Sequence, residues 1–202
     1  LPSVVFALLS TLSGSIEKAF IIGDFIFPPI IFFLTFLLAS FFLKNKYYAL
    51  SVAFFTVIAR DFITVIPFPH ATFQYLTVAE GQNYLLYLSR AFHPQLTFIF
   101  FLAAFICFLK LSLDPSKKIW IIATGLFFGS LFYSYVFYWT YFSLFFLMVS
   151  AYSLITKNWK LLKSLFAAGV IVFTLSFYYL ITIYQFHNLD LFQDFVEKTT
   201  LG

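Results

Sequence analysis

A short polar cluster in the middle of the chain has the residue types that bind phosphate. Arg90, His93 and Gln95 lie within six residues of the sequence, and Pro94 suits the first turn of a helix that begins there. The start of a helix presents free backbone N–H groups that favour an anion, and the planar arginine side chain pairs with phosphate through two hydrogen bonds. The cluster predicts a phosphate or pyrophosphate site. The alternative is an interfacial arginine with a histidine near a helix cap.

Three further charged residues lie inside or beside apolar stretches, where an unpaired charge is costly. Arg60 and Asp61 follow an apolar run that is too short to cross a membrane alone. They either face a wet cavity on a longer helix or cap a helix that ends early. Asp24 lies shortly before Pro28 and Pro29, and proline is tolerated in a first helical turn. The pattern predicts Asp24 at the outer start of a helix, as a structural cap or as an acid at the mouth of a cavity.

Aromatic residues gather in a second region, where their flat rings could cover the face of a sugar or contact a lipid. Tyr133, Tyr135, Tyr138 and Trp139 lie within an uncharged stretch. Belts of tyrosine and tryptophan also anchor helices at the membrane interface, so both interpretations stay open. The pair Gly125 and Gly129, which precedes this block, permits close helix packing and carries no chemistry of its own.

The composition shows which elements must position these residues. Of 202 residues, 62% are hydrophobic and only 10% are charged, and the mean hydropathy is +0.97. These values predict an integral membrane protein and exclude an ordinary soluble globule, a disordered chain and a nucleic-acid binder. Cys107 is the single cysteine, so no internal disulfide or cysteine metal cluster can form. No soluble-enzyme motif is present, and the sequence assigns no metal ligands.

The uncharged runs predict an all-α, polytopic transmembrane bundle of about six spans within one domain, residues 1–202. A span needs about 20 helical residues. Residues 1–24 are expected as an outer interfacial segment, 67–93 as an outer loop and 186–202 as an outer tail. The expected spans cover residues 25–43, 47–66, 94–110, two helices within 119–156 with a break between 133 and 141, and 165–184.

Basic residues predict the orientation of these spans. Three short loops, at residues 44–46, 110–118 and 157–163, hold eight of the twelve Lys and Arg residues and one acid, Asp114. The positive-inside rule assigns all three loops to the cytoplasm, which puts both ends of the chain outside. An amino end that is already outside before the first span predicts an upstream helix. We therefore expect the chain to be the interior of a longer protein in a prokaryotic plasma membrane.

These features together resemble the membrane core of GT-C-type glycosyltransferases, polytopic enzymes that use polyprenyl-phosphate sugars. The resemblance covers most of the chain and rests on four features: the interfacial segment Leu1 to Asp24, the entry Pro28-Pro29, the cluster Arg90 to Gln95, and the stretch Gly125 to Trp139 that ends in tyrosine-rich sequence. In that class a key acid generally lies in the first outer loop, after the first span. The start of this chain would cut that loop, and Glu17 and Asp24 are the acids that remain from it.

The resemblance implies a reaction and a role for each candidate residue. A sugar would be transferred at the outer face from a lipid-linked sugar donor, so membrane lipid and this donor are the expected partners. Asp24 or Asp61 would act as general base on the acceptor hydroxyl. Arg90, or secondly Arg60, would hold the phosphate, while His93 and Gln95 would orient donor or acceptor. No cofactor is implied with certainty, although a divalent metal without assigned ligands is compatible.

Two other functions fit the same sequence. In a transporter or flippase subunit for a lipid-linked or amphipathic substrate, Arg60 and Asp61 would line the pathway. Such proteins often contain internal repeats, and the two halves of this chain have no clear similarity, which favours the enzyme. A non-catalytic membrane partner is the third interpretation.

Overall fold

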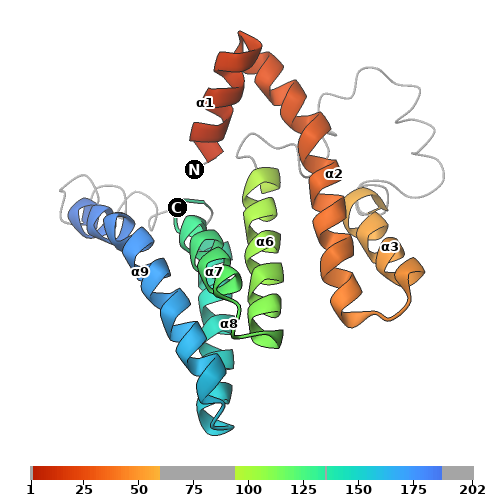
Figure 1. Ribbon diagram of the computed structural model, residues 1–202. Helices are drawn as coiled ribbons and strands as arrows, with labels where there is room; N and C mark the ends of the chain where they lie inside the picture. Colours follow the sequence, from red (N-terminus) through yellow and green to blue (C-terminus); the bar gives the residue numbers. More distant parts are fainter. Residues whose placement is uncertain (1, 60–93, 135, 188–202) are drawn as a thin grey trace, which may run out of the picture. The chain divides into compact units, whose positions relative to one another are not determined.

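The computed structural model describes residues 2–59, 94–134 and 136–187, and these form helices and turns without a strand (Figure 1). The all-α prediction is confirmed. Four helices within these ranges are long and apolar enough to cross a membrane, which supports an integral membrane protein. They are Ile16–Phe42, Gln95–Leu113, Phe137–Ile155 and Trp159–Gln185.

Two other apolar helical segments are too short to cross a 30 Å core by themselves. Helix α7 (Lys118–Leu131) has 14 residues, whereas α3 (Lys46–Phe54) has 9 and the π-helical segment η1 (Phe55–Ala59) that continues it has 5. Each rises about 21 Å. The predicted second span continues into residues 60–66, which lie outside the described residues. The structure therefore supports four of the six predicted spans.

The chain divides into two compact units, residues 1–110 and 111–202. Helix α6 belongs to unit 1 except for its last three residues. The elements of unit 1 are α1 (Pro2–Ser13), α2 (Ile16–Phe42), α3 (Lys46–Phe54), η1 (Phe55–Ala59) and α6 (Pro94–Leu113). The elements of unit 2 are α7 (Lys118–Leu131), α8 (Val136–Ile155) and α9 (Trp159–His187).

Helix α2 starts earlier than the sequence predicted and continues through Pro28 and Pro29. Its start is fixed by Ser15, whose side chain accepts a 3.2 Å hydrogen bond from the Lys18 N–H. Every fourth residue of α2 is then buried, and this continuous stripe offsets the backbone bond that each proline removes. The stripe consists of Ala19, Gly23, Phe27, Ile31, Thr35 and Ala39.

This longer helix corrects the predicted setting of Asp24. Asp24 lies well inside α2 and not at a helix start, so it does not cap the helix. The preceding α1 folds back on α2 through Gly14, whose φ of +79° is a conformation that glycine adopts without strain. Phe6 of α1 packs on Ala19 and Phe27 of α2 and on Leu96 of α6. The segment before Asp24 is therefore a packed helical hairpin.

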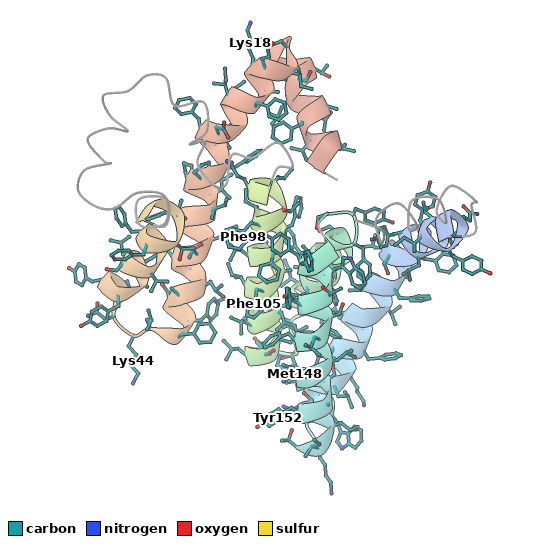
Figure 2. The ribbon with its side chains drawn as sticks, turned by 180° about the vertical axis from the view of Figure 1, so that it is seen from behind. Lys18, Lys44, Phe98, Phe105, Met148 and Tyr152 are labelled. Carbon is teal, nitrogen blue, oxygen red and sulfur yellow. The ribbon has the colours of Figure 1, made fainter. Side chains whose placement is uncertain are left out.

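Helices α2 and α6 run parallel in unit 1, because the same ends of both lie together. Leu96, near the start of α6, packs against the N-terminal half of α2. At the other end, the Lys110 ammonium group lies 4.9 Å from the centre of the Phe41 ring. Lys44 and Lys46 follow directly, so these three lysines define the lysine end of unit 1. Figure 2 shows Lys18 and Lys44 at opposite ends of α2.

Unit 2 gathers its lysines in the same way. The Ser164 hydroxyl of α9 donates a 2.7 Å hydrogen bond to the Pro115 carbonyl in the turn before α7. The two predicted cytoplasmic loops of this unit therefore lie at one end, which we call the lysine end of unit 2. Within each unit, the lysine-rich turns therefore lie at the same end of the unit, while their side of the membrane stays a prediction.

The α8–α9 turn contains Lys157, the one non-glycine residue with a positive φ in the described part of the chain. Lys157 has a φ of +55°, a value that favours glycine. Hydrogen bonds from Lys157 N–H to the Leu154 carbonyl and from Asn158 N–H to the Ser153 carbonyl close the end of α8. The Asn158 side chain then caps α9 by accepting from the Leu161 N–H.

Gly125 and Gly129 bring α7 against α9, as the spacing predicted. A Cβ atom on Gly125 would lie 2.7 Å from Cβ of Ile171, and one on Gly129 would lie 2.9 Å from Cβ of Leu175. Both neighbours are fixed to the α9 backbone and cannot rotate away. Gly169, on α9 itself, has nothing within 4 Å of such a Cβ and serves as a matched control.

We expect Gly125→Ala and Gly129→Ala each to lower the free energy of unfolding by about 1–3 kcal/mol, because overpacking forces the helices apart. Gly169→Ala should be neutral or slightly stabilising, since alanine favours helix and no clash opposes it. Unfolding of the purified protein in mixed micelles measures all three. Equal effects of the three substitutions would refute the close α7–α9 contact.

Candidate functional site

Two predicted site residues from distant parts of the chain meet in unit 1. The Gln95 side-chain amide donates a 3.1 Å hydrogen bond to a carboxylate oxygen of Asp24. Gln95 begins the first turn of α6 and is 3% exposed, whereas Asp24 is exposed on α2. A buried neutral side chain thus holds an accessible carboxylate in place. This pairing of Asp24 with Gln95 is the candidate site.

The same glutamine has a second polar group that lacks a partner. The carbonyl oxygen Oε1 of Gln95 is buried and accepts no hydrogen bond from any residue that the structure describes. Its amide group must face Asp24, because a carboxylate accepts hydrogen bonds and does not donate them. The carbonyl oxygen is therefore the free group. A buried acceptor without a donor is costly, so the site favours a ligand or side chain that donates a hydrogen bond here.

Helix geometry sets the depth of the pair in the membrane. At 1.5 Å per residue, Asp24 lies about 27 Å along α2 from Phe42, and Gln95 lies about 27 Å along α6 from Leu113. Both helices end at their lysine-rich turns. The pair therefore lies near the far edge of a hydrocarbon core about 30 Å thick. This depth permits contact with water and with lipid headgroups.

The aromatic candidates in unit 2 make structural contacts. The Tyr133 hydroxyl donates a 2.7 Å hydrogen bond to the Leu175 carbonyl, and its ring lies 5.8 Å from that of Tyr179. Trp139 stacks on Phe132 at 4.7 Å, and its indole nitrogen is buried without a partner among the described residues. Tyr138 is half-buried in the first turns of α8. Packing of α7 and α8 on α9 explains Tyr133 without a ligand.

The turn between α7 and α8 narrows one prediction. Helix α7 ends at Leu131 and α8 begins at Val136, so the break falls at the start of the predicted aromatic block. Tyr138 and Trp139 are helical. The observed break therefore falls at the beginning of the range 133–141 in which it was predicted.

Five of the predicted site residues lie outside the described residues: Arg60, Asp61, Arg90, His93 and Tyr135. Their roles stay predictions. Among the residues that are described, no three His, Cys, Asp or Glu side chains come together as a metal site.

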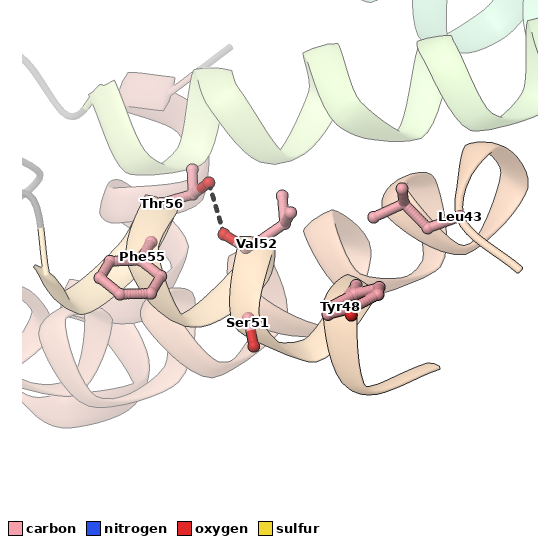
Figure 3. A pocket seen from close by; sticks show the side chains of 6 residues that line it. All are labelled: Leu43, Tyr48, Ser51, Val52, Phe55 and Thr56. Carbon is pink, nitrogen blue, oxygen red and sulfur yellow. Dashed lines mark hydrogen bonds between the residues drawn. The ribbon is translucent and has the colours of Figure 1, made fainter. Parts of the chain in front are cut away.

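A groove along α3 and η1, with Leu43 at one end, has fewer polar groups that could recognise a ligand. It has a volume of about 690 Å³ and is lined by Leu43, Tyr48, Ser51, Val52, Phe55 and Thr56 (Figure 3). The Thr56 hydroxyl donates to the Val52 carbonyl at 2.8 Å, and the Ser51 hydroxyl donates to the Tyr47 carbonyl at 2.9 Å. Both hydroxyl groups are thus occupied by their own helix. No charged side chain lines this groove.

Sequence reasoning missed that Gln95 and Asp24 bind each other. A usable signal was present, because each residue precedes a lysine-rich turn by a similar number of helical residues. Parallel helices of equal depth would bring both to the same level. The sequence alone does not give the rotation of each helix, and the rotation decides whether the side chains face one another.

Comparison with known proteins adds no relative. The sequence matches no protein-family model, and neither curated proteins nor solved structures give a significant match. The resemblance to GT-C-type enzymes therefore stays a prediction from the residues. A proposal for the function therefore depends on the contact between Asp24 and Gln95.

A double-mutant cycle tests the pair. We expect Asp24→Ala and Gln95→Ala each to destabilise the protein, and the double variant to lose less than the sum, with a coupling of about 1 kcal/mol. Unfolding in mixed micelles measures the coupling. Glu17→Ala, an exposed acid on the same helix, is the matched control and should show none with Gln95→Ala. Additive losses for Asp24 and Gln95 would mean that the hydrogen bond contributes nothing.

Proposed function

We propose that this chain is the membrane core of a glycosyltransferase that transfers a sugar from a polyprenyl-phosphate-linked donor at the outer membrane face. The observation that carries the proposal is the exposed Asp24 carboxylate, held by the buried Gln95 at the end of unit 1 opposite Lys44, Lys46 and Lys110. An acid at this depth can reach both a lipid-bound donor and a water-borne acceptor.

The proposed chemistry uses Asp24 as general base. Asp24 accepts the proton of the acceptor hydroxyl while that oxygen attacks the anomeric carbon, and the bond to the phosphate oxygen breaks. The free carbonyl of Gln95 accepts a hydrogen bond from a sugar hydroxyl, which orients the ring. Arg90, a few residues before α6, binds the leaving phosphate and stabilises its charge. His93 would act beside it.

The distribution of charge favours an enzyme over a transporter. In the helices that the structure describes, charged side chains lie in the first two turns or the last turn, and Asp24 is the exception near one edge. A transport pathway for a charged headgroup needs polar groups at every depth. A site confined to one edge suits a reaction in which the lipid-linked donor stays in its own leaflet.

The test uses proteoliposomes that contain the full chain and a panel of polyprenyl-phosphate-linked hexoses and pentoses. We expect Asp24→Asn to lower sugar transfer to water or an added acceptor by 10²–10⁴-fold, the usual contribution of a general base. Binding of the lipid donor should be unchanged. Arg90→Lys should weaken donor binding, because the bidentate contact is lost.

Glu17→Gln is the matched control, since Glu17 is an exposed acid two turns before Asp24, and it should leave transfer unchanged. Movement of the lipid-linked sugar across the bilayer without any transfer would refute the enzyme and support a transporter. Full activity of Asp24→Asn would refute the role of Asp24.

A further inference from the structure

A second open groove lies within unit 2, between α8 and α9. Its volume is about 840 Å³, within the range of small-molecule sites. It begins beside the turn that joins the two helices and follows α9 from its first residues to the middle of the helix. Its principal lining residues are Phe146, Trp159, Lys163, Gly169, Val170 and Phe173.

Gly169 lies on an open part of the groove wall. Gly169 has no atom within 4 Å of the position that a Cβ would occupy. By contrast, Gly125 and Gly129 are each filled by a side chain from α9. The walls beside Gly169 are apolar, and Val170 and Phe173 are 51% and 60% exposed. This shape and chemistry suit a flexible hydrocarbon chain.

The mouth of the groove is positively charged. Lys163 lines it, and Lys157 and Lys160 lie in the same turn region. Among the described residues of unit 2, Asp114 is the one acid, and it is already engaged by Lys117 at 3.1 Å. A hydrogen bond from Ser116, together with Lys117, holds the pKa of the Asp114 carboxyl below its ordinary value, so it stays ionised and paired. Lys163 therefore has no described acid to neutralise it.

We propose that the α8–α9 groove binds a phospholipid with an anionic headgroup. The phosphate binds Lys163 beside Trp159, whose exposed ring suits the interface between headgroup and hydrocarbon. One acyl chain follows α9 over Gly169 to Phe173, a rise of about 15 Å from Lys163. The lysine end is the predicted cytoplasmic end, where anionic lipids attract basic side chains. The proposal is independent of the sugar-transfer reaction, which we assign to unit 1.

Quenching of Trp159 fluorescence tests the proposal directly. Trp120→Phe and Trp139→Phe leave Trp159 as the reporter in the otherwise intact chain, reconstituted in nanodiscs. The probes are phosphatidylglycerol and phosphatidylcholine with brominated acyl chains, each diluted in unbrominated phosphatidylcholine. We expect half-maximal quenching at a mole fraction about five-fold lower for phosphatidylglycerol, the preference that one lysine provides.

Three variants distinguish a built site from general attraction. Lys163→Gln should abolish the preference, whereas the matched control Lys160→Gln, which does not line the groove, should retain it. Gly169→Leu should reduce quenching by both lipids because its side chain fills the groove. Gly169→Ala should reduce quenching less, and it serves where the leucine variant does not fold.

Three outcomes would overturn the proposal. Equal quenching by both lipids in the parent protein would mean that the headgroup charge is not recognised. Equal effects of Lys160→Gln and Lys163→Gln would reduce the site to diffuse electrostatics. Absence of quenching by either lipid would mean that another protein segment covers the groove.

Discussion

The inability of hydrocarbon to form hydrogen bonds constrains every polar group in this chain. Most hydroxyl groups meet the constraint locally. Ser40, Ser143 and Thr174 each donate to the backbone carbonyl four residues earlier in the same helix. Asp24 and Gln95 meet it between helices, and only in part, because Gln95 keeps a buried carbonyl oxygen free. The free carbonyl oxygen of Gln95 therefore distinguishes the Asp24–Gln95 pair from these three hydroxyl groups, which are satisfied within their own helices.

The same constraint applies to charged side chains, which in the described helices lie toward the ends of each unit and not in its apolar middle. Lys44, Lys46 and Lys110 lie at one end of unit 1, and Lys157, Lys160 and Lys163 lie at one end of unit 2. The Asp24 carboxylate lies toward the other end of unit 1, where Lys18 also lies. The glycines of unit 2 have two different structural roles. Gly125 and Gly129 close a helix contact that holds α7 on α9, and Gly169 leaves a groove open beside the lysine turn. Small residues thus build the fold in one place and a binding surface in another.

The sequence predicted the helical class, the long apolar spans and the lysine turns, because these depend on composition and spacing alone. It misplaced the start of α2, because Pro28 and Pro29 suggested a first helical turn, whereas the helix begins at Ile16 and its buried stripe runs from Ala19 to Ala39. It named Asp24 and Gln95 separately but not as a pair. Their contact joins residues 71 positions apart and depends on helix rotation, which local pattern does not encode.

The proposed function depends most on the proposed orientation of the helices, with Asp24 and Gln95 toward the outer face of the membrane. Single cysteines at Lys18, Lys44, Ser116 and Lys160, in a Cys107→Ala background, test it with an impermeant thiol reagent on intact cells. The account predicts that Lys18→Cys reacts at once and that the other three react only after the cells are permeabilised. Reaction of the three lysine-end cysteines in intact cells, with protection of Lys18→Cys, would contradict it.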